Sequence, residues 1–185
     1  MEKSRIIEVL NRWNFWSRDI DTGILRKNYV DRLLKFVKTD KIISIVGVRR
    51  AGKSTLIKQM AKKLIDEGVD RNNILIINFE EPEFENADVA FLNTIYEAYT
   101  EIIRPSGKPF LFLDEIQNVK KWEKFVRSLT ERKEAFITVS GSSSKLLSEE
   151  LATVLTGRQI YFEVFPLSFR ELLDFENIQI KDTRD

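Results

Sequence analysis

The nine residues GVRRAGKST fit the pattern G-x-x-x-x-G-K-[ST] and directly follow the apolar run KIISIV. Glycines in this pattern let successive backbone N–H groups face a phosphate, and the helix that follows adds the positive end of its dipole. Lys53 can then bridge the β- and γ-phosphates, while the Ser54 hydroxyl can ligate Mg²⁺. The segment predicts a nucleotide site made of Gly47, Val48, Arg49, Arg50, Ala51, Gly52, Lys53, Ser54 and Thr55.

Cleavage of a bound nucleotide needs a second Mg²⁺ anchor, a group that orients water, and a cation for the charge of the transition state. The segment PFLFLDE supplies the first two, because four apolar residues form a strand that ends in Asp114 and Glu115. Ligands of parallel α/β sheets gather at the carboxyl ends of strands. We expect Asp114 to hold Mg²⁺ through water and Glu115 to polarise the attacking water, although acidic residues also end strands simply as solvated caps.

A glutamate directly after this aspartate is typical of the ATPase division of P-loop proteins, which carries an extra strand between the two motifs. The segment NILIINF supplies that strand and predicts the sheet order 5-1-4-3-2. The same division places a polar sensor residue after the next strand, here AFITVSGSS, and Ser140 and Ser142 are the candidates. A Ser/Gly-rich turn that caps a following helix explains either serine equally well.

Three arginines are candidates for the remaining cation. Arg158, in LTGRQIYFEV, follows Gly157 at the start of the fifth predicted strand and could reach the γ-phosphate in cis or across a subunit boundary. A surface arginine in a loop is an equally good explanation. Arg49 and Arg50 lie inside the phosphate loop, where contact with phosphate and an outward orientation are both open, the outward orientation being slightly favoured.

Composition excludes several other chemistries. The chain has 185 residues, a net charge of +1, and neither Cys nor His. A disulfide framework, a Cys/His zinc site, a thiolate nucleophile and an imidazole base are therefore excluded. Charges interrupt the apolar residues of the N-terminus, and no run approaches the roughly 20 apolar residues of a membrane span. We expect a cytoplasmic protein without a membrane partner.

The elements that must position these residues alternate between strands and helices from residue 41 onward. Several strands are continuously apolar, which predicts burial on both faces and a five-stranded, mainly parallel sheet between two helical layers. Helical patterns precede the sheet, and others follow its strands, including 143–155 and a last helix with Pro166 near its start. We expect a helical segment at 1–40 that packs on the core, an ATPase core at 41–175 and a polar tail at 176–185.

Four motifs in order resemble the AAA-type ATPase domain widespread in archaea and bacteria, which lies close to the archaeal and signal-transducing NTPase branches of the P-loop superfamily. They are GVRRAGKSTL, FLFLDEIQNVKKWEKFVRSL, ITVSGSSSKLLSEELATVLTGR and VFPLSFRELLDF. The resemblance implies ATP and Mg²⁺ at Lys53, Ser54, Asp114 and Glu115, and it implies that Gly157-Arg158 is a family signature. Members usually continue into a further domain after PLSFREL, so we expect this chain to be shortened.

These residues favour a Mg²⁺-dependent ATPase that acts as a motor or switch for a C-terminal or partner module. Two alternatives stay open at this point. One is a nucleotide-gated interaction module with little hydrolysis of its own, in which copies of the chain associate and Arg158 acts in trans. The other is a P-loop small-molecule kinase, against which the Asp-Glu pair speaks.

Nucleic acid is only weakly indicated as a partner. The basic clusters KKW and RSLTERK lie on a helix that acidic residues balance, which is typical of a solvated face. Trp13 and Trp16 could stack on bases, but their helical spacing with Ile6 and Val9 predicts packing on the core.

Overall fold

Five parallel strands form one sheet in the order β2-β3-β4-β1-β5 in the computed structural model, which describes residues 1–142 and 157–176. The strands are β1 (Ile42–Val46), β2 (Ile74–Asn78), β3 (Phe110–Asp114), β4 (Phe136–Gly141) and β5 (Gln159–Glu163). Read from the opposite edge, this is the order 5-1-4-3-2. The predicted fold class, a parallel sheet with the inserted strand β2, is therefore confirmed.

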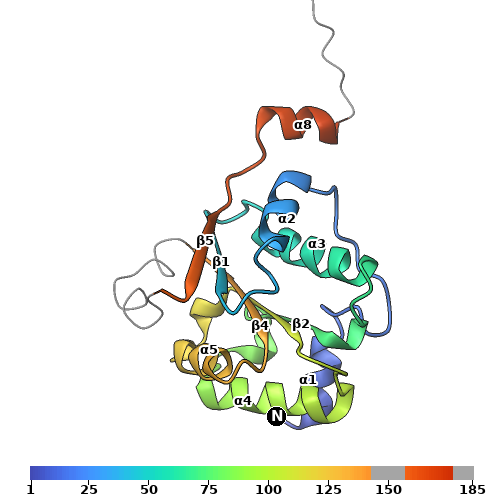
Figure 1. Cartoon of the computed structure of the whole chain (residues 1–185). Helices are drawn as coiled ribbons and strands as arrows, with labels where there is room; N and C mark the ends of the chain where they lie inside the picture. The colour runs from blue at the N-terminus through green and yellow to red at the C-terminus, as the bar shows by residue number, and fades with distance from the viewer. Residues whose placement is uncertain (143–156, 177–185) are drawn as a thin grey trace, which may run out of the picture.

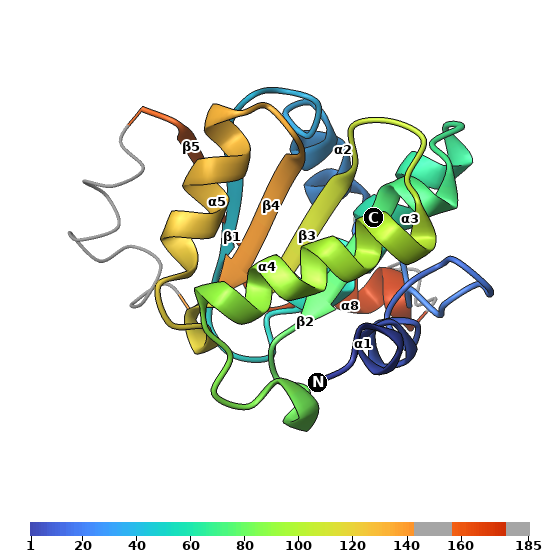
Figure 2. The same ribbon diagram turned by 90° about the horizontal axis from the view of Figure 1, so that it is seen from below.

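Helices cover both faces of the sheet (Figures 1 and 2). α4 and α5 lie across one face with α1 beside them, and α2 and α3 cover the other face. These helices are α1 (Lys3–Leu10), α2 (Lys27–Leu34), α3 (Lys53–Asp66), α4 (Val89–Ala98) and α5 (Trp122–Glu131). A further helix, α8 (Phe169–Phe175), lies beyond α2 at the end of an extended segment that follows β5 (Figure 1).

Alternation along the strands builds a core on each face, because successive side chains point to opposite sides of a sheet. In β1, Ile42 and Val46 join the core under α1, α4 and α5, while Ile43 and Ile45 join the core under α2 and α3. Leu113 and Phe112 of β3 divide in the same way. The central strands are buried on both sides, as their continuous apolar sequences predict.

Two helix boundaries differ from the expectation. α4 continues into a π-helical turn, Tyr99–Ile103, which the apolar pattern did not distinguish from an α-helix. α8 begins at Phe169 rather than near Pro166, because Ser168 and Glu171 form a capping box at its start. The helix expected at 143–155 and the tail at 177–185 lie outside the described residues.

The two helices of the segment 1–40 pack on opposite faces of the sheet. Ile6 and Leu10 of α1 are buried with α4, and Val30 and Leu33 of α2 are buried against α3. The segment thus contributes to both cores. None of the helices in the described part of the chain is long and apolar enough to cross a membrane.

Candidate nucleotide site

The phosphate-loop sequence connects the carboxyl end of β1 to the first turn of α3. Gly52 ends the loop with a φ of 90°, a left-handed conformation that glycine adopts without strain. A Cβ at Gly47 would lie 2.3 Å from the carbonyl oxygen of Val164, just after β5. This contact requires glycine at the first position of the motif, because only a residue without a side chain lets the loop pass so close to β5.

Lys53 is the first residue of α3, and its ammonium group turns back under the loop. Its Nζ donates to the carbonyl oxygens of Gly47 and Val48 at 3.1 and 3.3 Å. The same Nζ lies 3.3 Å from Oε1 of Glu115, and the Lys53 side chain is only 5% exposed. A buried ammonium group that faces the inside of the loop is available to an anionic ligand, which would replace these partners.

Asp114 ends β3 as a buried carboxylate beside the hydroxyl group of Ser140. Ser140, at the adjacent position in β4, donates its Oγ hydrogen to Oδ1 of Asp114. Burial raises the pKa of the Asp114 carboxyl above its usual value, the hydroxyls of Ser140 and Ser54 act against this rise, and the charge of Glu115 adds to it. A buried carboxylate beside a serine hydroxyl offers oxygen ligands of the kind that Mg²⁺ prefers.

Glu115 directly follows β3 in a left-handed conformation with a φ of 53°, which is uncommon for a residue with a side chain. Its backbone N–H donates to Oγ of Ser140 at 3.1 Å, and its Oε2 accepts from Nε2 of Gln117 at 2.5 Å. The carboxylate is thus held between Lys53 and Gln117. Strained residues of this kind persist where the surroundings determine them, and they cluster at functional sites.

The structure therefore brings together Lys53, Asp114, Glu115 and Ser140, which were predicted from three separate motifs. Ser142 lies half-buried just after β4. Between the two predicted sensor candidates, Ser140 is the one with hydrogen bonds to both acidic residues of the site. The role of either serine as a sensor stays a prediction.

The three predicted arginines are not among these contacts. Arg49 and Arg50 are exposed residues of the loop, and Arg49 lines a surface hollow of about 680 Å³ with the acidic residues Glu80 and Glu81. Arg158 precedes β5, whose residues pair in register with β1, so it lies at the amino end of the sheet, opposite the phosphate loop. Its Nη1 there pairs with Glu131 at 2.9 Å. The arrangement does not support action of Arg158 in cis, and its action in trans stays a prediction.

Two residues at the site were not predicted from the sequence. Gln117 contacts the catalytic candidate Glu115, and the acid-rich segment DEIQ gave no local pattern that marks a glutamine for this role. Arg26 donates to the carbonyl oxygen of Ala51 inside the loop from a segment that precedes the sheet. The sequence contains no local signal for this contact, because the two residues come from distant parts of the chain.

The two tryptophans near the N-terminus contact the chain itself. Trp16 stacks on Tyr99, with ring centroids 5.9 Å apart, and its Nε1 donates to the carbonyl oxygen of Ile74. Nε1 of Trp13 donates to Glu81 at 2.6 Å. Both indole N–H groups are satisfied within the fold, which agrees with the packing role expected from their spacing.

Residues 39–173 match a family model described as an AAA domain. An uncharacterized protein of Haemophilus influenzae is 40% identical over 157 residues, which are 84% of this chain and 38% of that protein. An uncharacterized protein of Methanocaldococcus jannaschii is 40% identical over 143 residues, which are 77% of this chain and 30% of that protein. The chain thus spans between 30% and 38% of the length of these two curated relatives.

Solved structures share the fold at low sequence identity. The Hsp104–ADP complex of S. cerevisiae is similar with a TM-score of 0.65 and 17% identity, over 85% of this chain and 24% of that chain. Cdc6p from Pyrobaculum aerophilum is similar with a TM-score of 0.56 and 14% identity, over 83% of this chain and 48% of that chain.

Proposed function

The chain belongs to the AAA domain family, and we propose that it binds ATP with Mg²⁺ and hydrolyses the bond to the γ-phosphate. The observation that carries this proposal is the convergence of Lys53, Asp114 and Glu115 at the carboxyl ends of β1 and β3. A phosphate loop alone accounts for binding. An acidic pair beside the lysine of the loop accounts for cleavage as well.

The residues present fit both ligands. The loop backbone from Gly47 to Thr55 would hold the phosphates, and Lys53 would exchange its carbonyl partners for phosphate oxygens. Ser54 and Asp114 would hold Mg²⁺, which supplies positive charge against the phosphate oxygens. The raised pKa of Asp114 supports this role, because a cation next to the carboxylate offsets the cost of burying its charge.

Glu115 is the residue that we assign to water activation. Its carboxylate would orient a water molecule and accept its proton as the water oxygen bonds to the γ-phosphorus and the bond to the bridging oxygen breaks, which yields ADP and phosphate. In the structure Glu115 is paired with Lys53 at 3.3 Å. A phosphate that takes over Lys53 would release Glu115 for this task, so binding and activation are linked.

A second function is favoured by the position of Arg158. Because this arginine lies at the amino ends of the strands, opposite the loop, it would not stabilise the charge of the transition state in its own copy of the chain. The chain would then be a nucleotide-gated module whose hydrolysis waits for Arg158 of a second copy. A specific ATPase rate that rises with protein concentration supports this form of the proposal, and a constant rate contradicts it.

We propose in addition that the chain acts as a motor or switch, and this role rests on the same site. Loss of the γ-phosphate would remove one of the two phosphate partners of Lys53, so the contacts of Lys53 and Glu115 would differ before and after cleavage. Such a difference can drive a change of shape in a partner module.

ATP binding tests the proposal through a pair of lysines in one helix. We expect Lys53→Ala to weaken Mg·ATP binding by about tenfold or more, because the buried ammonium group contacts phosphate. Lys63→Ala, exposed on the same helix, is the control and leaves the affinity unchanged. Equal ATP affinities of Lys53→Ala and the wild type, measured by calorimetry, would refute the assignment of the loop.

A further inference from the structure

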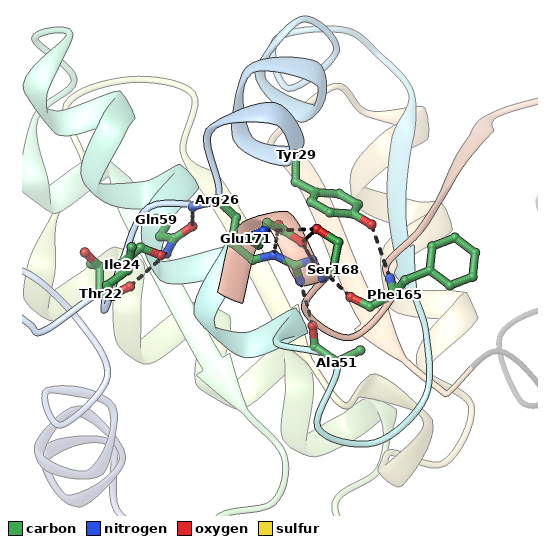
Figure 3. A network of polar contacts seen from close by, with 9 residues as sticks. All are labelled: Thr22, Ile24, Arg26, Tyr29, Ala51, Gln59, Phe165, Ser168 and Glu171. Carbon is green, nitrogen blue, oxygen red and sulfur yellow. Dashed lines mark hydrogen bonds and ion pairs between the residues drawn. The ribbon is translucent and has the colours of Figure 1, made fainter. Parts of the chain in front are cut away.

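A buried arginine joins three parts of the chain that lie far apart in the sequence (Figure 3). Arg26 immediately precedes α2, and its side chain is 4% exposed. Its Nη1 donates to the carbonyl oxygen of Ala51 in the phosphate loop at 2.8 Å, and its Nη2 donates to that of Phe165 after β5 at 3.0 Å. Its Nε and Nη2 donate to the two carboxylate oxygens of Glu171 in α8 at 2.8 and 3.2 Å.

The segment that carries Arg26 is itself fixed to α3. Oε1 of Gln59, a buried residue of α3, accepts from the backbone N–H of Arg26 at 3.1 Å. Nε2 of the same amide donates to the carbonyl oxygens of Thr22 and Ile24 at 2.9 and 2.8 Å (Figure 3). Arg26 is therefore fixed both through its backbone and through its guanidinium group, so a shift of one partner is transmitted to the others.

The contact with Ala51 orients a donor of the phosphate loop. In a planar trans peptide, the C=O of one residue and the N–H of the next point in opposite directions. Because Arg26 fixes the direction of the Ala51 C=O, it also fixes the opposite direction of the Gly52 N–H, one of the loop donors that we expect to face phosphate. Nη1 of Arg26 also lies 3.6 Å from the position that a Cβ of Gly52 would occupy.

The contact with Glu171 fastens α8. Glu171 also accepts from the backbone N–H and the hydroxyl of Ser168, each at 2.9 Å, and thereby closes the capping box of this helix. Tyr29 adds to the same attachment, since its ring lies under the guanidinium group of Arg26 at 4.4 Å and its hydroxyl accepts from the N–H of Phe165 at 3.3 Å. The fork of a guanidinium group suits this two-oxygen contact, which a lysine ammonium group would not reproduce.

We propose that Arg26 is a positioning residue that couples the phosphate loop to α8, so that nucleotide binding and the attachment of α8 strengthen each other. The inference rests on the proposed function, because its ligand is the phosphate of a bound nucleotide. A phosphate that engages the N–H of Gly52 fixes the Ala51 peptide and with it Arg26, which then holds Glu171 more firmly. Coupling of this kind is reciprocal, so a variant that releases α8 also weakens the binding of the nucleotide.

The test measures both ends of this link in the full chain. Glu171→Gln weakens the attachment while it keeps the size of the side chain, and Glu163→Gln, exposed at the end of β5, is the matched control. The dissociation constant of Mg·ADP is measured by calorimetry, and hydrogen exchange of the amides at 165–173 is measured with and without Mg·ADP. In the wild type and Glu163→Gln, we expect Mg·ADP to slow this exchange by about threefold or more.

We expect Glu171→Gln to lose this effect of the nucleotide and to raise the dissociation constant about three- to tenfold. Arg26→Lys should have the same two effects. The double variant should bind Mg·ADP no more weakly than the weaker single variant, because both changes break the same contact between Arg26 and Glu171. Three- to tenfold weaker binding together with an unchanged response of α8 to Mg·ADP overturns the coupling.

Failure of the coupling and failure of the proposed function give different results. A wild-type chain that binds Mg·ADP, together with a Glu171→Gln variant that binds it equally well, overturns the coupling alone. A wild-type chain that binds neither Mg·ADP nor Mg·ATP overturns the proposed function and the coupling together.

Discussion

Replacement of Gly47 by alanine tests whether the phosphate loop is fixed by its passage along β5. The new Cβ would lie 2.3 Å from the carbonyl oxygen of Val164, whereas a carbon–oxygen contact normally needs about 3.3 Å or more. Val164 is fixed on both sides, because its own N–H donates to the carbonyl oxygen of Val46 at 2.8 Å and the peptide that carries its C=O donates through the N–H of Phe165 to the hydroxyl of Tyr29 at 3.3 Å. The loop or the end of β5 must therefore shift by about 1 Å.

The expected cost combines two effects. Overpacking in a well-packed region costs about 1 to 3 kcal/mol, and loss of the hydrogen bond between Val164 and Val46 adds about 1 kcal/mol. We therefore expect Gly47→Ala to lower the free energy of unfolding by about 2 to 4 kcal/mol. Because the displaced loop no longer aligns its N–H groups, the affinity for Mg·ADP should fall about tenfold or more where the variant is still folded.

Urea unfolding followed by tryptophan fluorescence measures the stability, and calorimetry measures the affinity. Gly107→Ala is the control, since the nearest atom to its new Cβ, Nδ2 of Asn73, is 3.7 Å away. It should change the free energy of unfolding by no more than about 0.5 kcal/mol. A Gly47→Ala variant that matches Gly107→Ala in both measurements would refute the idea that the approach to β5 shapes the loop.

Three further predictions concern charge. Burial raises the pKa of Asp114, so the contribution of Asp114 to stability falls as pH rises from the usual carboxyl range through the raised value. Asp114→Asn should therefore be more stable than the wild type in urea at neutral pH and lose this advantage in acid, and it should bind nucleotide less tightly in the presence of Mg²⁺. The pKa of Glu171 is lowered from 4.5 to about 2 by Arg26, so its stabilisation of α8 is present above pH 4.5 and lost as pH falls toward 2. Hydrogen exchange of the amides at 165–173 should therefore accelerate over this pH range in the wild type and not in Glu171→Gln. Arg158→Ala should leave the ATP affinity unchanged, because Arg158 lies at the far edge of the sheet, and should abolish any rise of the specific ATPase rate with protein concentration; a lower ATP affinity would contradict the first expectation, and a persistent rise would contradict the second.

The sheet could be predicted from the sequence because its signals are local. The continuously apolar strands, such as FLFLD, show burial on both faces, and a motif at each strand end fixes the direction in which the strands run. The inserted strand β2 then determined the order. The π-helical turn after α4 was missed, because an apolar helical pattern continues through it without a change in composition.

The residues of the site likewise divide into those that a local sequence pattern reveals and those that it does not. Lys53 could be predicted from the loop motif that follows β1. Asp114 and Ser140 could be predicted because they lie at the carboxyl ends of β3 and β4, and parallel strands bring these ends together. Arg26 could not, since the hydrogen-bond partners of its side chain come from distant segments and its neighbours in the sequence look like an ordinary helix start. For Arg158, the position beside a strand was visible in the sequence, whereas its place at the amino end of β5, away from the loop, follows from the register of β5 with β1.

The release of phosphate by a Glu115→Gln variant tests whether Glu115 activates water for cleavage of ATP. The ATP affinities of the wild type and the variant are compared by calorimetry. Both proteins are then saturated with Mg·ATP, and the release of phosphate is followed over a single turnover. We expect Glu115→Gln to bind ATP within about threefold of the wild type and to release phosphate at least about 100-fold more slowly, because the group that orients water is gone. Release at the wild-type rate, or no release by the wild type at any protein concentration, would contradict this expectation.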